Sequence, residues 1–172
     1  MAISPDTKDW TWVLDEPCEE CGFNAGKFPP ENVGHRLRID VPRWQAVLAG
    51  SDAGERPNPS TWSPTEYACH VRDVFGLFTE RLRLLLEDDD PQFANWDQGV
   101  TAIESDYAGQ EASIVSGQLV AEGEKAAGAF DSVPADAWDR PGRRSNGSVF
   151  TAGTLAQYFL HDIVHHLHDV NG

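Results

Sequence analysis

Apolar residues recur at helical spacing in four segments of the chain, and each segment predicts a helix. The clearest segment carries six apolar side chains three or four positions apart: Tyr67, Val71, Val74, Phe78, Leu82 and Leu85. This spacing keeps them on one face of a helix. Ser63 precedes the segment as an N-cap, Pro64 takes the first helical position, and Glu66 completes the sequence pattern of a capping box. Pro91 follows the segment and predicts its end.

Three further segments repeat this period and predict helices over residues 31–48, 110–130 and 151–170. Pro42 interrupts the first of them, so a kink or a restart is expected there. The second is expected to direct three residues inward: Ile114, Leu119 and Ala126. The third carries four apolar residues along one face: Leu155, Phe159, Ile163 and Leu167.

The segments between these helices are long, and they show no strong strand pattern. The connections over residues 91–109 and 132–153 exceed the usual loop length, so they are expected to be functional or partly helical, with a helical turn near residues 135–138. Four helices without strands predict an all-α four-helix bundle. The long connections argue against a simple up-down-up-down order. Residues 1–30 lack periodicity and are expected to form an irregular N-terminal arm packed on a domain over residues 31–172.

Composition and charge narrow the range of partners. The chain has 172 residues and a formal net charge of −15, with 40% hydrophobic residues. An acidic chain of this kind repels nucleic-acid phosphates and anionic membranes, so neither is expected as a partner. We find no run of about 18 apolar residues and no secretory signal pattern at the start of the sequence. Three cysteines, one of them necessarily unpaired, fit the reducing cytoplasm.

Four of the six histidines lie close together in the segment "FLHDIVHHLHDV". With about 100° of rotation per residue, His161, His165 and His168 share one helix face, and His166 points elsewhere. Histidines at positions i and i+4 can both reach one metal ion. His161 and His168 lie roughly 10 Å apart along the axis, so all three cannot easily bind the same ion. A third ligand is therefore expected from another helix.

His70 is the strongest candidate for this third ligand. It lies one turn into the second predicted helix, beside the apolar stripe, where an unpartnered imidazole would be costly. His35 is the alternative, although its surroundings look more exposed. A hydrogen-bonded core histidine is the structural explanation for His70. His166 and His168 would then only interact with the negative end of the last helix.

These features resemble the DinB-like superfamily. The resemblance rests on "WSPTEYACHVRDVFGLFTERLRLLL", "DDPQFANWDQ" and "YFLHDIVHHLHDV", and it extends over roughly residues 30–170. It implies a four-helix bundle of up-down-down-up order and a divalent metal, zinc or sometimes nickel, bound by His70, His161 and His165. It also implies a homodimer. The superfamily includes mycothiol and bacillithiol S-transferases and mycothiol-dependent maleylpyruvate isomerase.

The resemblance leads to a chemical expectation. Three imidazoles leave a metal position open, and a thiol bound there would lose its proton and attack an electrophile. We therefore expect a thiol S-transferase or isomerase that uses a low-molecular-weight thiol. Arginine outnumbers lysine by ten to three, a ratio typical of a GC-rich genome, which favours mycothiol over bacillithiol. Two alternatives stay open, a non-catalytic protein with a saturated metal site and an interaction module whose histidines are structural.

Several other residues could support such a site. Arg143 and Arg144 would bind an anionic group of the substrate or thiol cofactor, or form a solvated surface pair. Trp96 would line the entrance or pack its loop. Asp73 and Asp162 could orient the histidines, but Asp162 points about 100° away from the first histidine of its helix, which favours a surface role.

The sequence C-E-E-C formed by Cys18 and Cys21 is half of a zinc knuckle. A second C-x-x-C pair is absent from the sequence. Three interpretations stay open: free or buried thiols, a disulfide or redox pair, and a second metal site completed by residues from elsewhere. Cys69 is interpreted as a small core residue.

Overall fold

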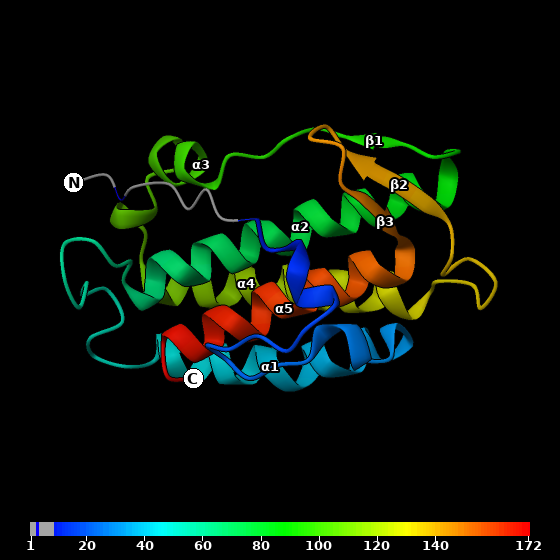
Figure 1. The fold of residues 1–172 in the computed structure, drawn as a ribbon. Helices are drawn as coiled ribbons and strands as arrows, with labels where there is room; N and C mark the ends of the chain where they lie inside the picture. Colours follow the sequence, from blue (N-terminus) through cyan, green and yellow to red (C-terminus); the bar gives the residue numbers. More distant parts are fainter. Residues whose placement is uncertain (1–2, 4–8) are drawn as a thin grey trace.

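The computed structural model describes residue 3 and residues 9–172, and four long helices form its centre (Figure 1). These helices are α1 (Val33–Leu48), α2 (Pro64–Glu87), α4 (Ala112–Asp131) and α5 (Ala152–Asp169). In Figure 1, α1 and α5 run toward the left and α2 and α4 run toward the right. The all-α class and the up-down-down-up order are therefore confirmed. None of the described helices is long and apolar enough to cross a membrane.

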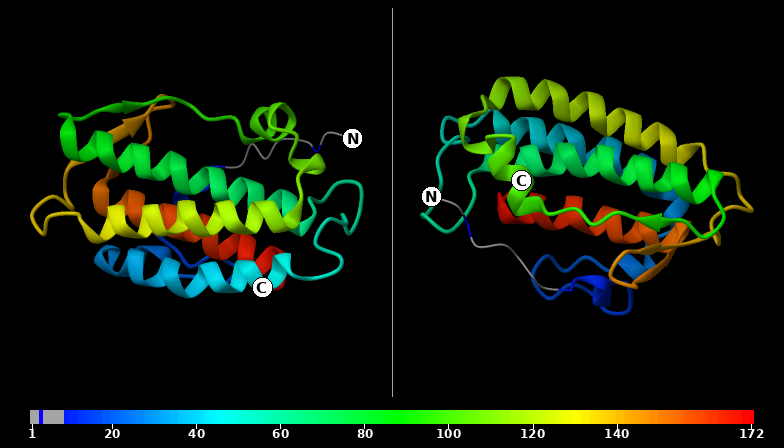
Figure 2. Two further views of the ribbon diagram at one scale, coloured as in Figure 1. Left: turned by 180° about the vertical axis from the view of Figure 1, so that it is seen from behind. Right: turned by 90° about the horizontal axis from the view of Figure 1, so that it is seen from above.

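The long connection between α2 and α4 follows from this topology. Since α2 and α4 run in the same direction, the chain must return along the bundle between them, as Figure 2 shows. The return contains β1 (Gln92–Phe93), α3 (Gln98–Glu104) and the 3-10 turn η4 (Tyr107–Gly109). The connection expected to be partly helical is thus helical in α3 and η4.

A small sheet was not expected from the sequence. Its strands are β1, β2 (Pro141–Arg144) and β3 (Val149–Thr151), in that order, with β1 parallel to β2 and β2 antiparallel to β3. The strands are only two to four residues long, too short for an alternating apolar pattern to stand out.

The core is built around one aromatic side chain of α5. Phe159 is fully buried, and its ring stacks on Phe130 of α4 at 5.1 Å and on Phe78 of α2 at 5.2 Å. Leu119 and Ala126 are buried, as expected, but the inward placement of Ile114 was wrong, since its side chain is 57% exposed. Ile114 lies in the first turn of α4 on the side that faces away from the bundle, and the next residue, Val115, is buried in its place.

A restart at Pro42 is not present, because α1 continues through it from Val33 to Leu48. Pro42 lies on the exposed side of α1, between the buried Val41 and Trp44. The proline ring removes one helical hydrogen bond. On this side of the helix, water can satisfy the freed carbonyl, so the helix tolerates the residue.

The N-terminal arm lies against α5 (Figure 1). It contains three short 3-10 turns, η1 (Thr11–Leu14), η2 (Ala25–Lys27) and η3 (Pro30–Asn32). Gln157 of α5 donates a hydrogen bond to the carbonyl oxygen of Phe28 at 2.8 Å. The division into an arm over residues 1–30 and a bundle over residues 31–172 stays a prediction, and residues 1–2 and 4–8 lie outside the described part.

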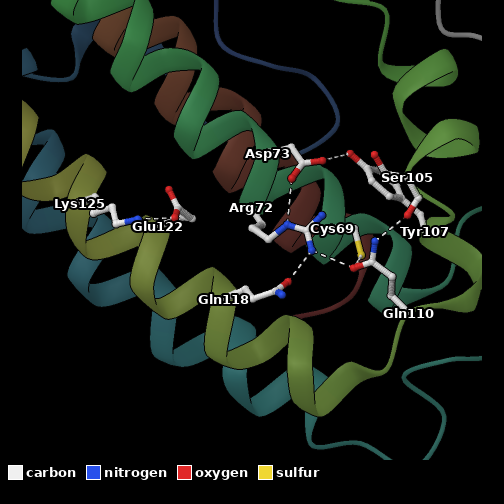
Figure 3. Close-up of polar contacts among 9 residues, drawn as sticks. All are labelled: Cys69, Arg72, Asp73, Ser105, Tyr107, Gln110, Gln118, Glu122 and Lys125. Carbon is white, nitrogen blue, oxygen red and sulfur yellow. Dashed lines mark hydrogen bonds and ion pairs between the residues drawn. The ribbon is translucent and has the colours of Figure 1, made fainter.

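A polar network ties the returning connection to the bundle (Figure 3). Arg72 of α2 donates to Asp73 at 2.9 Å, to Gln110 at 2.8 Å and to Gln118 of α4 at 2.6 Å. The Tyr107 hydroxyl donates to the other oxygen of Asp73. These contacts hold the end of the connection and therefore restrain the preceding segment, which includes Trp96.

The predicted capping box at the start of α2 is present and is extended by an arginine. The Glu66 amide donates to the Ser63 hydroxyl, and the Ser63 amide donates to the Glu66 carboxylate at 2.8 Å. Arg56 reaches the same carboxylate from the preceding loop with its Nε at 2.8 Å. Glu66 is 2% exposed. Burial raises its pKa, but the hydrogen bonds from Arg56 and Ser63 outweigh burial and hold the pKa below its usual value.

Removing the ring at the centre of the core should destabilise the fold. We expect Phe159→Ala to lower the free energy of unfolding by about 3–5 kcal/mol, because it deletes a buried ring and leaves a cavity. Urea denaturation, monitored by circular dichroism, measures the change in the free energy of unfolding. Ile114→Ala is the matched control and should cost less than about 0.5 kcal/mol, since Ile114 is exposed. Equal effects of the two substitutions would contradict this description of the core.

The charge of Glu66 should make stability depend on pH. Since its pKa is lower in the folded state, the carboxylate stabilises the fold above its unfolded pKa of about 4.3, and this contribution is lost as the pH falls through the folded pKa. Glu66→Gln should therefore lower unfolding free energy by roughly 1–3 kcal/mol at pH 7 and by progressively less in acid. Glu80→Gln, at an exposed ion pair with Arg83, should change it little.

Candidate metal centres

Helix α5 carries two overlapping pairs of metal-ligand residues. His161 and His165 form one i, i+4 pair, and Asp162 and His166 form another that is offset by one residue. An offset of one residue rotates the second pair by about 100° around the helix. The two pairs therefore face different neighbours.

The described residues contain two groups whose ligand atoms all lie within 4.8 Å of one another. The first group is His70, Asp162 and His166, and the second is Cys18, Cys21, His161 and His165. The first joins α2 to α5, and the second joins the N-terminal arm to α5. We refer to them as the three-residue centre and the four-residue centre.

The spacing in the three-residue centre fits a metal ion. Nε2 of His70 lies 3.2 Å from Oδ1 of Asp162, and Nε2 of His166 lies 3.8 Å from the same oxygen. Two ligands about 2.1 Å from a tetrahedral ion are roughly 3.4 Å apart. A divalent ion could thus contact all three residues after only small movements of the side chains.

Aromatic residues hold the imidazoles of this centre in place. His70 is fully buried, and its ring lies 5.4 Å from the stacked ring of Trp96 and 5.7 Å from Trp62. The ring of Tyr67 lies 5.1 Å from His166. His70 is therefore fixed by packing, and its Nδ1 forms no hydrogen bond with any described residue.

Two carboxylates lie beside the imidazoles of this centre. Burial raises the pKa of Asp162, but the neighbouring His70 and His166 outweigh burial and hold that pKa below its usual value, so the carboxylate is ionised. Asp169 accepts a hydrogen bond from Nδ1 of His166 at 2.8 Å. A carboxylate in this position fixes the ring so that the other nitrogen, Nε2, faces a metal.

The four-residue centre is more enclosed. Cys18 is 1% exposed, His161 is 4% exposed and His165 is 6% exposed. The Cys18 sulfur lies 3.6 Å from Nδ1 of His165. All three cysteines of the chain are free thiols in the structure. Nε2 of His161 is buried and has no hydrogen-bond partner among the described residues.

Burial determines the protonation states in the four-residue centre. It lowers the pKa of His161 to about 4, with a further contribution from the charge of His165, so the imidazole is neutral at pH 7. Burial also raises the pKa of the Cys21 thiol to about 11. A neutral imidazole can act as a metal ligand directly, whereas the thiol must lose its proton when it binds.

A cavity of about 660 Å³ adjoins both centres. Asp162 and His166 line it, and so do His161 and His165. Its other walls include an apolar group formed by Val74, Leu77, Phe78 and Trp96 and a cationic pair formed by Arg81 and Arg144. A cavity of this size can enclose a small molecule.

The structure divides the residues that the sequence analysis grouped together. His161 and His165 lie in the four-residue centre, whereas His70 lies in the three-residue centre. Arg144 lines the cavity, but Arg143 forms an ion pair with Asp90 on the surface. Trp96 both lines the cavity and stacks on His70.

The sequence analysis did not group Asp162 and His166 with His70. Asp162 was expected at the surface, and His166 was expected to interact with the negative end of the last helix. The signal was nevertheless present, since D-x-x-x-H has the same i, i+4 spacing as H-x-x-x-H and carboxylate oxygen is also a zinc ligand. His35 and His168 are exposed and belong to neither centre.

Comparisons with known proteins agree with this fold. The sequence profile of the DinB superfamily matches residues 42–170. A solved structure of YfiT from Bacillus subtilis, described as a probable metal-dependent hydrolase with an unusual four-helix bundle topology, is similar with a TM-score of 0.63 and 15% identity. The match covers 98% of this chain and 91% of YfiT, and at that identity it shows the shared fold. No sequence of a curated protein matches the chain.

Proposed function

The chain belongs to the DinB superfamily, and from this membership we propose that it is a divalent-metal-dependent enzyme that joins a low-molecular-weight thiol to a small electrophile. The observation that carries the proposal is the three-residue centre at the wall of the cavity. Three protein ligands leave a coordination position for a substrate, which is the pattern of catalytic rather than structural zinc sites.

We assign the metal to His70, Asp162 and His166. Two imidazoles and a carboxylate suit zinc, and nickel is the second choice. The set implied by the family resemblance, His70, His161 and His165, is the alternative. The contacts of 3.2 and 3.8 Å around Oδ1 of Asp162 favour the first assignment, and the cysteines beside His161 and His165 offer those two histidines a different ion.

The ion supplies one chemical effect, which is to lower the pKa of a bound thiol so that it is a thiolate near neutral pH. The protein supplies the surroundings. Burial raises the pKa of Tyr67 to about 12, so this phenol beside His166 keeps its proton and can donate a hydrogen bond in the cavity. Trp96 and Phe78 cover the cavity wall and exclude water from a nucleophile held there.

The two arginines of the cavity select an anionic group. Arg81 is 6% exposed, and its guanidinium lies 5.1 Å from the centre of the Phe78 ring. Burial lowers the pKa of Arg81 to about 10, with a further contribution from Arg144, so the guanidinium stays charged at pH 7. Its Nε has no hydrogen-bond partner among the described residues. We infer that the electrophile carries a carboxylate, which guanidinium groups bind well.

Mycothiol is the thiol that we propose, since arginine outnumbers lysine by ten to three, a ratio typical of a GC-rich genome. Hydrolysis is the second candidate, because the structurally similar YfiT is described as a probable metal-dependent hydrolase and the same ion could activate water. A thiol requirement separates the two reactions.

Substitution of the assigned ligands should remove one metal per chain. We expect His70→Ala, Asp162→Ala and His166→Ala each to lose one equivalent of zinc, measured by elemental analysis of untagged protein purified without chelators. Asp169→Asn should weaken binding by roughly 10- to 100-fold, because it orients His166. His35→Ala is the exposed control. Two results together would support the alternative ligand set. Asp162→Ala would keep all of its zinc, and His161→Ala would lose the ion that His70 binds.

The reaction should require a thiol and should favour a charged electrophile. Zinc-loaded protein is mixed with mycothiol and either a chloronitrobenzoate or the uncharged chlorodinitrobenzene. The thiolate displaces chloride from the ring, and formation of the thioether is monitored by absorbance. Arg144→Ala should raise KM for the benzoate by roughly 10-fold or more and leave the uncharged compound unaffected, since it removes a charged partner of the carboxylate. Arg143→Ala, at the surface ion pair with Asp90, should leave KM unchanged for both the benzoate and the uncharged compound.

Two results of this assay would contradict the proposal. Thiol-independent release of product from an ester or amide substrate would support hydrolysis. No thioether formation above the level of free zinc and thiol, with any electrophile tested, would support a non-catalytic metal-binding protein.

A further inference from the structure

We propose that Cys18, Cys21, His161 and His165 form a second metal site, a closed zinc site that fastens the N-terminal arm to α5. The proposal does not depend on the proposed function, since it uses other residues and a different ligand chemistry. It rests on the four ligand atoms that lie within 4.8 Å of one another.

The distances match a tetrahedral zinc site with sulfur and nitrogen ligands. With Zn–S bonds of about 2.3 Å and Zn–N bonds of about 2.0–2.1 Å, a sulfur and a nitrogen on one ion lie roughly 3.6 Å apart. The Cys18 sulfur lies 3.6 Å from Nδ1 of His165. Two cysteines and two histidines complete the Cys₂His₂ set of structural zinc sites, with no position left for a substrate.

The backbone around the two cysteines forms a turn that brings both sulfurs to the same side. The Cys18 amide donates to the carbonyl oxygen of Phe23 at 2.9 Å, and the Gly22 amide donates to the carbonyl oxygen of Cys18 at 2.8 Å. Gly22 has a φ of +72°, a left-handed conformation that glycine adopts without strain. The turn is therefore organised before a metal binds.

The two histidines are oriented toward this turn through defined nitrogens. Nε2 of His165 faces the Glu20 carboxylate at 3.6 Å, which leaves Nδ1 for the ion and the Cys18 side. A carboxylate on the outer nitrogen is the usual support of a zinc-bound histidine. Nε2 of His161 is buried without a hydrogen-bond partner among the described residues, a cost that metal binding would remove. Trp10 covers both rings, at 5.6 Å and 5.0 Å.

A metal explains this cluster better than a disulfide or two unrelated thiols. A Cys18–Cys21 disulfide would use both sulfurs and leave Nε2 of His161 unpartnered in the interior. Two free thiols would also leave Nε2 of His161 without a partner. Zinc satisfies all four ligands at once, and it would add a fixed connection to the apolar contacts of Val13 and Ala25, which already bury part of the arm. The site would fix Trp10 and Glu20, which line the cavity, beside the ligands of the three-residue centre.

Cobalt substitution tests the site directly, because thiolate ligands give cobalt(II) a charge-transfer band in the near ultraviolet that histidine and carboxylate ligands do not. Untagged full-length protein is purified under reducing conditions, stripped of metal and titrated with cobalt(II). The wild type should bind two equivalents and show the band. Cys21→Ser and the double variant Cys18→Ser/Cys21→Ser should lose one equivalent and lose or sharply weaken the band. Cys69→Ser, which removes a buried thiol elsewhere, should keep both.

The His70→Ala variant separates this proposal from the proposed function. It should lose one equivalent of cobalt and keep the thiolate band, so failure of one centre is visible independently of the other. Zinc X-ray absorption of the wild type should show sulfur scatterers at about 2.3 Å. Cobalt or zinc bound by nitrogen and oxygen alone, or a Cys18–Cys21 disulfide that persists in reducing buffer, would overturn the proposal.

Discussion

The rotation of about 100° per residue along α5 determines the arrangement of the two centres. Two i, i+4 pairs that differ by one residue cannot point the same way on a helix. Asp162 and His166 therefore meet His70 on α2, whereas His161 and His165 meet the arm at Cys18 and Cys21. The up-down-down-up order makes this possible, because α5 lies against both α1 and α2 and leaves one side for the arm. One helix thus carries the residues of both candidate centres, and the two groups differ in ligand chemistry.

The electrostatics of the interior agree with two metal ions. Imidazole rings are buried at His70, His161 and His165, and each of the first two has a nitrogen without a hydrogen-bond partner among the described residues. Such atoms are costly in a low-dielectric interior. Carboxylates are placed around the rings, with Asp162 and Asp169 at the three-residue centre and Glu20 at the four-residue centre. Of the two arginines of the cavity, Arg81 lies farther along α2, eleven residues or about 16 Å of helix beyond His70, and Arg144 ends strand β2. The cavity lining therefore includes both the candidate metal ligands Asp162 and His166 and the cationic Arg81.

The helices could be predicted from the sequence because their signals are local. The capping box at Ser63 and Glu66 and the apolar face through Phe159 depend on neighbouring residues, and both are present in the structure. The continuation of α1 through Pro42 could not be predicted, because it depends on which side of the helix faces solvent. The short strands could not be recognised either, since two to four residues show no period.

The candidate site could be predicted only in part, because its partners are distant in the sequence. The importance of the segment His161–His166 was evident from its spacing, and so was the inward position of His70. Which pair of α5 faces α2 depends on the rotation of the whole helix in the bundle, and sequence periodicity gives that rotation only to within about a residue. Cys18 lies 147 positions before His165, so its pairing with that histidine required the path of the arm. Family resemblance supplied a ligand set without the local Asp162.

Anomalous X-ray diffraction from zinc-loaded crystals grown without chelators tests the central claim most directly, because it locates each ion relative to its ligands. The account predicts two peaks per chain, one among His70, Asp162 and His166, and one among Cys18, Cys21, His161 and His165. A single ion shared by His70, His161 and His165, with the cysteines unbound, would contradict it.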